Sequence, residues 1–306
     1  MQNGPAVRRR KLGAELRELR TGAGLTSGEA ARLVGWHQSK VSRIETGASG
    51  VKSADVRLLL DAYGVTDRQQ RELLLVLAGS DDVGGRHHWW HAYRGVLPPA
   101  YRDFISLESQ ASEMRTLETS VVPGLLQTPE YARAVTGAAV GRSHDGPDGT
   151  GGPDGTVGPD APDDAEERLD ALVKVRLARQ DVLRSDPPLV LSAVLDEAVL
   201  RREVGGPEVM ARQLQRLLEA ARLPQVRLQV LPFSAGAHIG ITGPFVIFSF
   251  PSTSDLDVVV LDHLTSSLYL ERKEDLRAYS EAFNTLQIHA LSPEDSLDYI
   301  AGIGGA

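Results

Sequence analysis

The side chains best suited to directional hydrogen bonding lie close together near residue 40. Val41 and Ile44 are spaced as the buried face of a short helix, which leaves four polar residues on its outward face: Gln38, Ser39, Ser42 and Arg43. A glutamine amide can form two hydrogen bonds with the edge of adenine, and an arginine guanidinium two with guanine. The chemistry that this face offers is therefore direct contact with nucleic-acid bases.

Positive charge surrounds this segment. Residues 1–80 carry 13 Lys or Arg against 8 Asp or Glu, and the remainder carries 20 against 33, so the net charge of −8 conceals a basic head and an acidic body. Phosphate binding needs such local positive charge. The cations best placed to neutralise phosphates are Arg8, Arg9, Arg10, Lys11, Arg32 and Lys40, although a short basic run is also typical of a solvated tail.

The elements that must position these residues are five short helices within residues 1–80. Apolar residues recur at helical spacing in five stretches separated by glycines. Thr26 is placed to cap the second helix, which we expect over residues 26–34, and Gly35 supplies the turn into the third, expected over 38–46. The basic run 8–11 should precede the first helix. This arrangement predicts an all-α helix-turn-helix domain.

The residues of the head resemble the lambda-repressor-like, xenobiotic-response-element family. The resemblance rests on Leu16-Arg17-Glu18-Leu19-Arg20, Gly24-Leu25-Thr26, Tyr63-Gly64-Val65 and the run from Gln38 to Gly47. It implies that Glu45 pairs with Arg20 and that the outward face of the third helix enters the major groove. Ser27 stands where the family usually has a glutamine that touches phosphate, and Gly28 replaces a better helix former.

Residues 81–306 indicate a different architecture, α+β with a mixed sheet. A strand over 189–195, a helix striped by Met210 to Ala221 and a strand over 226–230 predict a strand–helix–strand crossover. A hairpin, a short strand at 267–270 and a closing helix follow. A helix is expected over 99–114 and another over 166–184. Residues 141–164 are mostly Gly, Pro and Asp, which predicts a disordered insert within this regulatory and dimerisation domain.

The body is similar to the uncharacterised C-terminal domain of actinobacterial WhiJ-like regulators. The similar segments are 122–134, 195–202 and 231–238, and with the head they cover nearly the whole chain except the insert. The resemblance implies a transcription regulator, which in those genomes is often paired with a small protein encoded by a neighbouring gene.

Candidate binding residues of the body are His238, Arg176, Arg179, Glu197 and Arg201. A glycine-rich loop around His238 is long enough to close over a ligand or a peptide, but it is also typical of an ordinary hairpin connection. The three arginines could meet an anion, yet such residues are more often surface charges of helices. An enzyme reading would use Asp196, Glu197 and His238 for acid–base work, but their spacing matches no catalytic motif.

Composition removes several other classes. The chain of 306 residues has no cysteine, which excludes disulfides and cysteine-ligated metals. His87 and His91 lack an evident third metal ligand. No apolar run approaches the ~18 residues of a membrane span. We therefore expect a cytoplasmic, nucleoid-associated, homodimeric regulator on a pseudo-palindromic operator in double-stranded DNA, without cofactor or metal, that senses a small molecule or a partner protein. An antitoxin-like switch and an enzyme domain remain alternatives.

Overall fold

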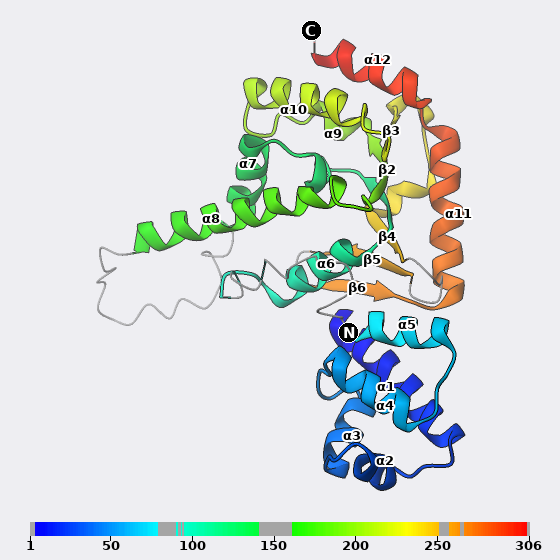
Figure 1. The fold of residues 1–306 in the computed structure, drawn as a ribbon. Helices are drawn as coiled ribbons and strands as arrows, with labels where there is room; N and C mark the ends of the chain where they lie inside the picture. The colour runs from blue at the N-terminus through cyan, green and yellow to red at the C-terminus, as the bar shows by residue number, and fades with distance from the viewer. Residues whose placement is uncertain are drawn as a thin grey trace.

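The computed structural model describes residues 4–78, 90, 93, 95–140, 161–250, 257–263 and 266–304. Among its helices, none is both long enough and apolar enough to cross a membrane. Two parts are evident along the chain (Figure 1): a helical head and a body built on one sheet. The expected α+β class is confirmed.

The head contains the five expected helices. Their bounds are α1 Gly4–Gly22, α2 Ser27–Leu33, α3 Gln38–Glu45, α4 Ser53–Ala62 and α5 Arg68–Leu77. The apolar residues of the sequence pattern form its core, including Leu16, Val41, Ile44 and Leu60. One expectation was wrong: α1 starts at Gly4, so residues 8–11 belong to the helix and do not precede it.

One glycine sets how closely two helices of the head approach. A Cβ at Gly13 of α1 would lie 2.5 Å from the carbonyl oxygen of Ile44 and 2.6 Å from that of Glu45. Both atoms are backbone at the end of α3, so they cannot rotate away. The absence of a side chain at Gly13 therefore lets α1 pack directly against the C-terminal end of α3.

The body is a six-stranded mixed sheet with the order β3-β2-β1-β4-β5-β6. The strands are β1 Glu113–Glu118, β2 Val190–Asp196, β3 Val226–Leu231, β4 Phe245–Ser249, β5 Val258–Asp262 and β6 Ser267–Leu270. β1, β2 and β3 are parallel, and β4, β5 and β6 continue the sheet antiparallel from β1. The predicted crossover and hairpin are confirmed.

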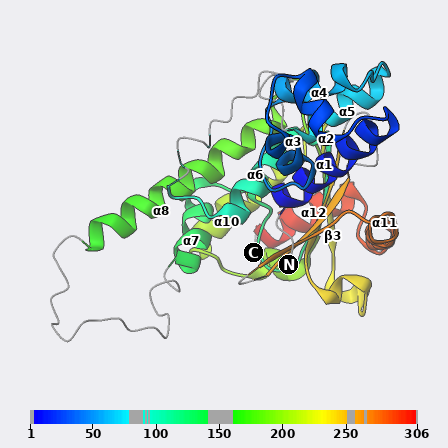
Figure 2. The ribbon, with the colours of Figure 1, turned by 90° about the horizontal axis from the view of Figure 1, so that it is seen from below.

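Helices cover both faces of this sheet. The α-helices of the body are α6 Pro99–Gln110, α7 Pro129–Val140, α8 Ala161–Ala178, α9 Glu197–Arg201, α10 Pro207–Ala220, α11 Lys273–His289 and α12 Pro293–Gly304. Short 3-10 helices are η2 Gly124–Leu126, η4 Arg179–Leu183, η5 Phe233–Ala235 and η6 Ile239–Thr242. Both views place α11 on one side of the sheet and α7, α8 and α10 on the other (Figures 1 and 2).

Alternation along the strands explains this layering, because successive side chains point to opposite faces. Leu117, Val194 and Val259 pack with Phe283 and Leu286 of α11. Their strand neighbours, among them Met114, Ala193, Leu195 and Val260, belong to the larger core on the opposite face. The sheet is therefore buried on both sides, and polar residues on its strands must find partners within the fold.

Three features of the body differ from the expectations. The helix expected over 99–114 ends at Gln110, and Met114 belongs to β1, the unpredicted strand at the centre of the sheet. α7 and α12 were also unpredicted. α8 spans 161–178 rather than 166–184, so the last four residues of the proposed insert, 161–164, are helical. Residues 141–160 of that insert lie outside the described residues.

Candidate nucleic-acid interface and body pocket

The turn between α2 and α3 is fixed by local hydrogen bonds. Thr26 caps α2: its hydroxyl accepts from the backbone N–H of Glu29, and the Glu29 carboxylate accepts from the backbone N–H of Thr26 at 2.8 Å. This capping box satisfies donors that the first turn of a helix leaves open. Gly35 then adopts a positive φ of 71° in the tight turn that follows. The sequence predicted the cap at Thr26 and the turn at Gly35, but not the reciprocal bond of Glu29.

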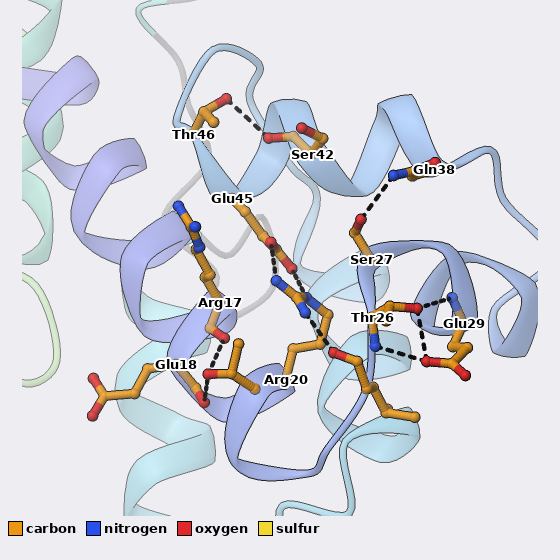
Figure 3. A network of polar contacts seen from close by, with 12 residues as sticks. Arg17, Glu18, Arg20, Thr26, Ser27, Glu29, Gln38, Ser42, Glu45 and Thr46 are labelled. Carbon is orange, nitrogen blue, oxygen red and sulfur yellow. Dashed lines mark hydrogen bonds and ion pairs between the residues drawn. The ribbon is translucent and has the colours of Figure 1, made fainter.

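The outward face of α3 is available for contacts. Ser39, Ser42 and Arg43 are exposed, while Val41 and Ile44 on the other face are fully buried. Gln38, also exposed, donates from its amide to the Ser27 hydroxyl at 3.0 Å (Figure 3). Ser27 thus replaces the expected glutamine and holds the first residue of α3 in position.

A buried ion pair connects α3 to α1. Arg20 donates to both carboxylate oxygens of Glu45, at 2.7 and 3.0 Å, and to the carbonyl oxygen of Leu25 at 2.5 Å. The pairing expected from the resemblance is present (Figure 3). Hydrogen bonding to Glu45 raises the pKa of Arg20 and outweighs the opposing effect of burial. The pair of hydrogen bonds neutralises the buried charge of Glu45 and also fixes the position of α3 relative to α1.

The proposed phosphate contacts have different surroundings. Arg32 is exposed at the end of α2. Lys40 lies 3.0 Å from the Asp55 carboxylate, and its ammonium sits 3.5 Å from the centre of the Trp36 ring. The side chains of residues 8–11 lie outside what the structure describes. Lys40 would therefore have to leave Asp55, or share its charge, in order to hold a phosphate.

The body contains a cavity of about 200 Å³ at the carboxyl end of β1. It is lined by residues of α6, β1, the segment 121–127, α8, η4, β4 and β5, and it opens to the surface. Apolar walls come from residues such as Phe104, Met114 and Val260, and polar groups come from Thr116, Glu118, Gln127, Arg176, Arg179 and Asp262. Convergent polar groups in an apolar cavity are typical of small-molecule sites.

The two arginines of this pocket have different roles. Arg179 is buried and donates to both Glu108 carboxylate oxygens, at 2.8 and 2.7 Å, and to the Tyr101 hydroxyl at 2.7 Å. Burial alone would lower the pKa of Arg179, but Glu108 and Tyr101 raise it. Arg176 donates to the Gln127 amide oxygen at 3.0 Å. Among the described residues no carboxylate lies within ion-pair distance of Arg176. Arg179 is thus structural, and Arg176 is a cation that forms no ion pair with a described residue.

Glu118 is the acid that sequence reasoning missed. Its carboxylate lies 3.1 Å from the Thr116 hydroxyl, on the face of β1 that borders the pocket. Burial raises the pKa of Glu118 to about 7, although Thr116 and Arg176 favour the ionised form, and the charge of Asp262 adds to the upward shift. A carboxyl that titrates near neutrality in a cavity is a signature of functional sites.

The other candidate residues of the body lie at the carboxyl end of β2 and do not line the pocket. Asp196 caps α9, and Glu197 pairs with Arg201 and accepts from the backbone N–H of Phe233 at 2.7 Å. Burial would raise the pKa of Glu197, but Phe233 and Arg201 lower it. His238 Nε2 lies 3.8 Å from an Asp196 carboxylate oxygen. The five predicted ligand residues therefore fall into two separate groups.

Two sequence observations concern histidine and tryptophan. Trp90 is buried beside Leu97, Ile105 and Val175. His87 and His91 lie outside the described residues. Within the part of the chain that the structure describes, no group of three or more His, Asp or Glu side chains could hold a metal ion.

Comparison with protein families agrees with both parts of the fold. The family described as Helix-turn-helix domain matches residues 11–74, which contain most of α1, all of α2 to α4 and most of α5. The family described as Domain of unknown function (DUF5753) matches residues 101–149 and 157–302. No curated protein and no solved structure is detectably similar to the chain. The chain is thus a helix-turn-helix regulator of the DNA-binding type whose body belongs to the DUF5753 family.

Proposed function

We propose that the chain is a sequence-specific transcriptional regulator that binds a two-fold-symmetric operator as a homodimer and changes its affinity when the body receives a signal. The observation that carries the proposal is the exposed polar face of α3 on a helix that Arg20 and Glu45 hold rigidly in place. Recognition helices read bases from such a fixed support.

Contacts to DNA divide by role. Gln38, Ser39, Ser42 and Arg43 meet base edges, with Gln38 suited to adenine and Arg43 to guanine. The phosphate contacts are Arg8, Arg9, Arg10, Lys11, Arg32 and Lys40, which set register and affinity without reading sequence. The hydrogen bond from Gln38 to Ser27 supports this division, since it fixes the first base-reading side chain before DNA arrives.

Self-association follows from the symmetry of such operators. Large exposed apolar side chains that support it occur in both parts of the chain. In the head Leu33 is 62% exposed, and in the body Phe233 and Ile241 are 58% and 70% exposed. Either the heads or the bodies can therefore provide the dimer contact.

The body acts as the receiver of the signal. Its pocket favours a small molecule as that signal because polar groups converge in an apolar cavity. Any such ligand changes operator affinity only through its different affinities for the two arrangements of the heads. A partner protein would act by the same rule on an exposed surface such as the loop around Ile241.

A catalytic role for the body has less support. Asp196 is used as a helix cap and Glu197 as the partner of Arg201 and of the Phe233 N–H, so both acids of the enzyme reading have structural work. General acid–base catalysis would need one of them directed at a substrate.

Selection of DNA from a random-sequence library tests the proposal. The full chain should enrich one inverted repeat, and its complex should contain two chains per DNA in native mass spectrometry. Enrichment of no sequence, or one chain per operator, would contradict the proposal. Native mass spectrometry of protein from its own host, with and without the neighbouring small protein, separates a retained small molecule from a protein signal.

A further inference from the structure

We propose that the pocket at the end of β1 binds a small apolar amino acid, with the ligand carboxylate on Arg176 and its ammonium on Glu118 and Asp262. This inference rests on the proposed function in one respect: the bound amino acid would be the signal that the body receives. One cation and two acids that are not paired with each other by an ion pair line this partly apolar pocket.

Arg176 supplies the anion-binding end. Its Nη1 is held by the Gln127 amide oxygen, and Gln127 is itself fixed by a bond from its amide nitrogen to the Val122 carbonyl oxygen at 2.7 Å. A guanidinium has five N–H donors, so this anchor leaves donors for a ligand carboxylate. Arg179 is less suited to the role because Glu108 neutralises its charge, and Glu108 and Tyr101 together take three of its five donors.

The acidic end comes from the sheet. β5 runs parallel to β1, since each is antiparallel to β4, and the last residues of both strands therefore lie at the same edge. Those residues are Glu118 and Asp262, and both line the pocket. The negative charge of Asp262 contributes to the raised pKa of Glu118, and a cation placed between the two carboxylates would relieve their repulsion.

The arrangement of the charges, with a cation and acids both lining the pocket, favours a zwitterion over a simple acid or amine. The Arg179–Glu108 pair is neutral, which leaves Arg176 against Glu118 and Asp262. A carboxylic acid alone would add a negative charge beside two acids, and an amine alone would leave Arg176 without an anion. A ligand that carries both groups satisfies both ends.

Size and walls limit the rest of the ligand. A cavity of about 200 Å³ has room for roughly seven water molecules, well below the ~300–1,000 Å³ of sites for drug-sized ligands. Phe104, Met114 and Val260 supply apolar walls of the pocket. These dimensions fit a single amino acid with a hydrocarbon side chain and exclude a nucleotide.

Hydrogen bonds and packing contacts connect the pocket to the DNA-binding head. Thr116, next to Glu118 on the same face, bonds the Phe245 carbonyl oxygen of β4 at 3.2 Å, and Tyr269 of β6 bonds the carbonyl oxygen of Ala100 at the start of α6. α6 packs against α1 of the head. A ligand in the pocket therefore contacts α6, which itself packs against the DNA-binding domain.

Calorimetric titration of the full chain tests the inference. The probes are valine, leucine and phenylalanine, each beside the matching compound without the amine and the one without the carboxylate. At least one amino acid should bind ten or more times more tightly than both of its analogues, because each lost charge-assisted hydrogen bond costs about tenfold or more. Binding of an acid analogue as tight as its parent, or no binding by any amino acid up to millimolar concentration, would overturn the inference.

Variants locate the bound molecule. Arg176→Gln and Glu118→Gln should each weaken amino-acid binding at least tenfold, whereas Arg168→Gln, an exposed position on the same helix, should leave it unchanged. Equal affinity in all three variants would place the ligand elsewhere. DNA binding by the same preparations, measured by anisotropy, shows that each variant is folded. Wild-type protein that binds DNA but no amino acid would refute this inference and leave the proposed function standing.

Discussion

Replacement of Glu45 by glutamine removes the carboxylate that holds Arg20 inside the head. Arg20 donates two bonds to Glu45 and one to Leu25, and the two charged side chains are only 9% and 5% exposed. Breaking one side of a buried pair costs about 3–5 kcal/mol because a charge is left without its partner. Glutamine keeps one acceptor, so we expect a loss of about 3 kcal/mol, near the lower end.

The double variant Arg20→Met/Glu45→Met separates lost charge pairing from lost packing. Removing both charges avoids the unpaired guanidinium, and only the bond to the Leu25 carbonyl oxygen is then lost, at about 1 kcal/mol. The double variant should therefore be about 2 kcal/mol more stable than Glu45→Gln. A double variant no more stable than the single one would contradict this reasoning.

Hydrogen exchange measured by mass spectrometry on the full chain reads this stability locally. A loss of about 3 kcal/mol should speed exchange of the α3 amides roughly 100-fold. Glu18→Gln, at an exposed position of the same helix as Arg20, serves as the control and should leave exchange unchanged. Exchange in Glu45→Gln within threefold of this control would refute the role assigned to the pair.

Three further outcomes are expected from the structure. Gly13→Ala should lower the melting temperature of the head, because the new Cβ would meet the α3 backbone and this clash outweighs a gain of about 1 kcal/mol in helix propensity. Gly22→Ala, where the Cβ has open space, is the control and should be neutral or stabilising. Equal effects of the two variants, measured by circular dichroism, would contradict the close packing of α1 against α3. Because burial raises the pKa of Glu118 to about 7, the native body keeps a proton that the unfolded chain releases near pH 4.5. The free energy of unfolding of the wild-type chain should therefore fall by up to about 3 kcal/mol between pH 4.5 and 7. Urea titrations of Glu118→Gln should show a smaller change of stability over the same pH range. Arg32→Gln should reduce the slope of log binding constant against log salt concentration by about 0.9. Lys40→Gln should reduce this slope by less, because Asp55 already neutralises part of the Lys40 charge. A larger change for Lys40→Gln than for Arg32→Gln would show that the ion pair with Asp55 opens on DNA.

The helices of the head could be predicted because they depend on local signals. Apolar residues at helical spacing, the cap at Thr26 and the turn at Gly35 all lie within a few residues of the elements they define. The ion pair of Arg20 and Glu45 joins positions 25 apart, and it was expected only through the family resemblance.

The central strand of the body could not be predicted in the same way. β1 begins and ends with glutamate and contains Arg115, so it lacks the apolar alternation that marked the other strands. Its charged residues are tolerated because Arg115 donates to the Ser280 hydroxyl of α11, and Glu118 accepts from Thr116 beside the pocket.

The pocket was missed for a related reason. Arg179 looked like a surface charge on a helix, but Glu108, 71 positions earlier, lies against it in the core. The anchor Gln127 sits 49 positions from Arg176. Without an established motif, contacts between residues so far apart in sequence cannot be predicted from their spacing. The pocket could therefore be identified only from the folded structure, in which several helices and strands line it.

The claim that the exposed face of α3 reads bases can be tested by removing the Arg43 side chain. Binding sites should be selected from a random library by the wild-type chain and by Arg43→Ala, and affinities then measured by anisotropy on the enriched sequence and its single-base variants. We predict that Arg43→Ala loses about 1–3 kcal/mol on the preferred sequence and loses its preference at one guanine. An equal loss of affinity on every sequence, with the same preference retained, would contradict the claim.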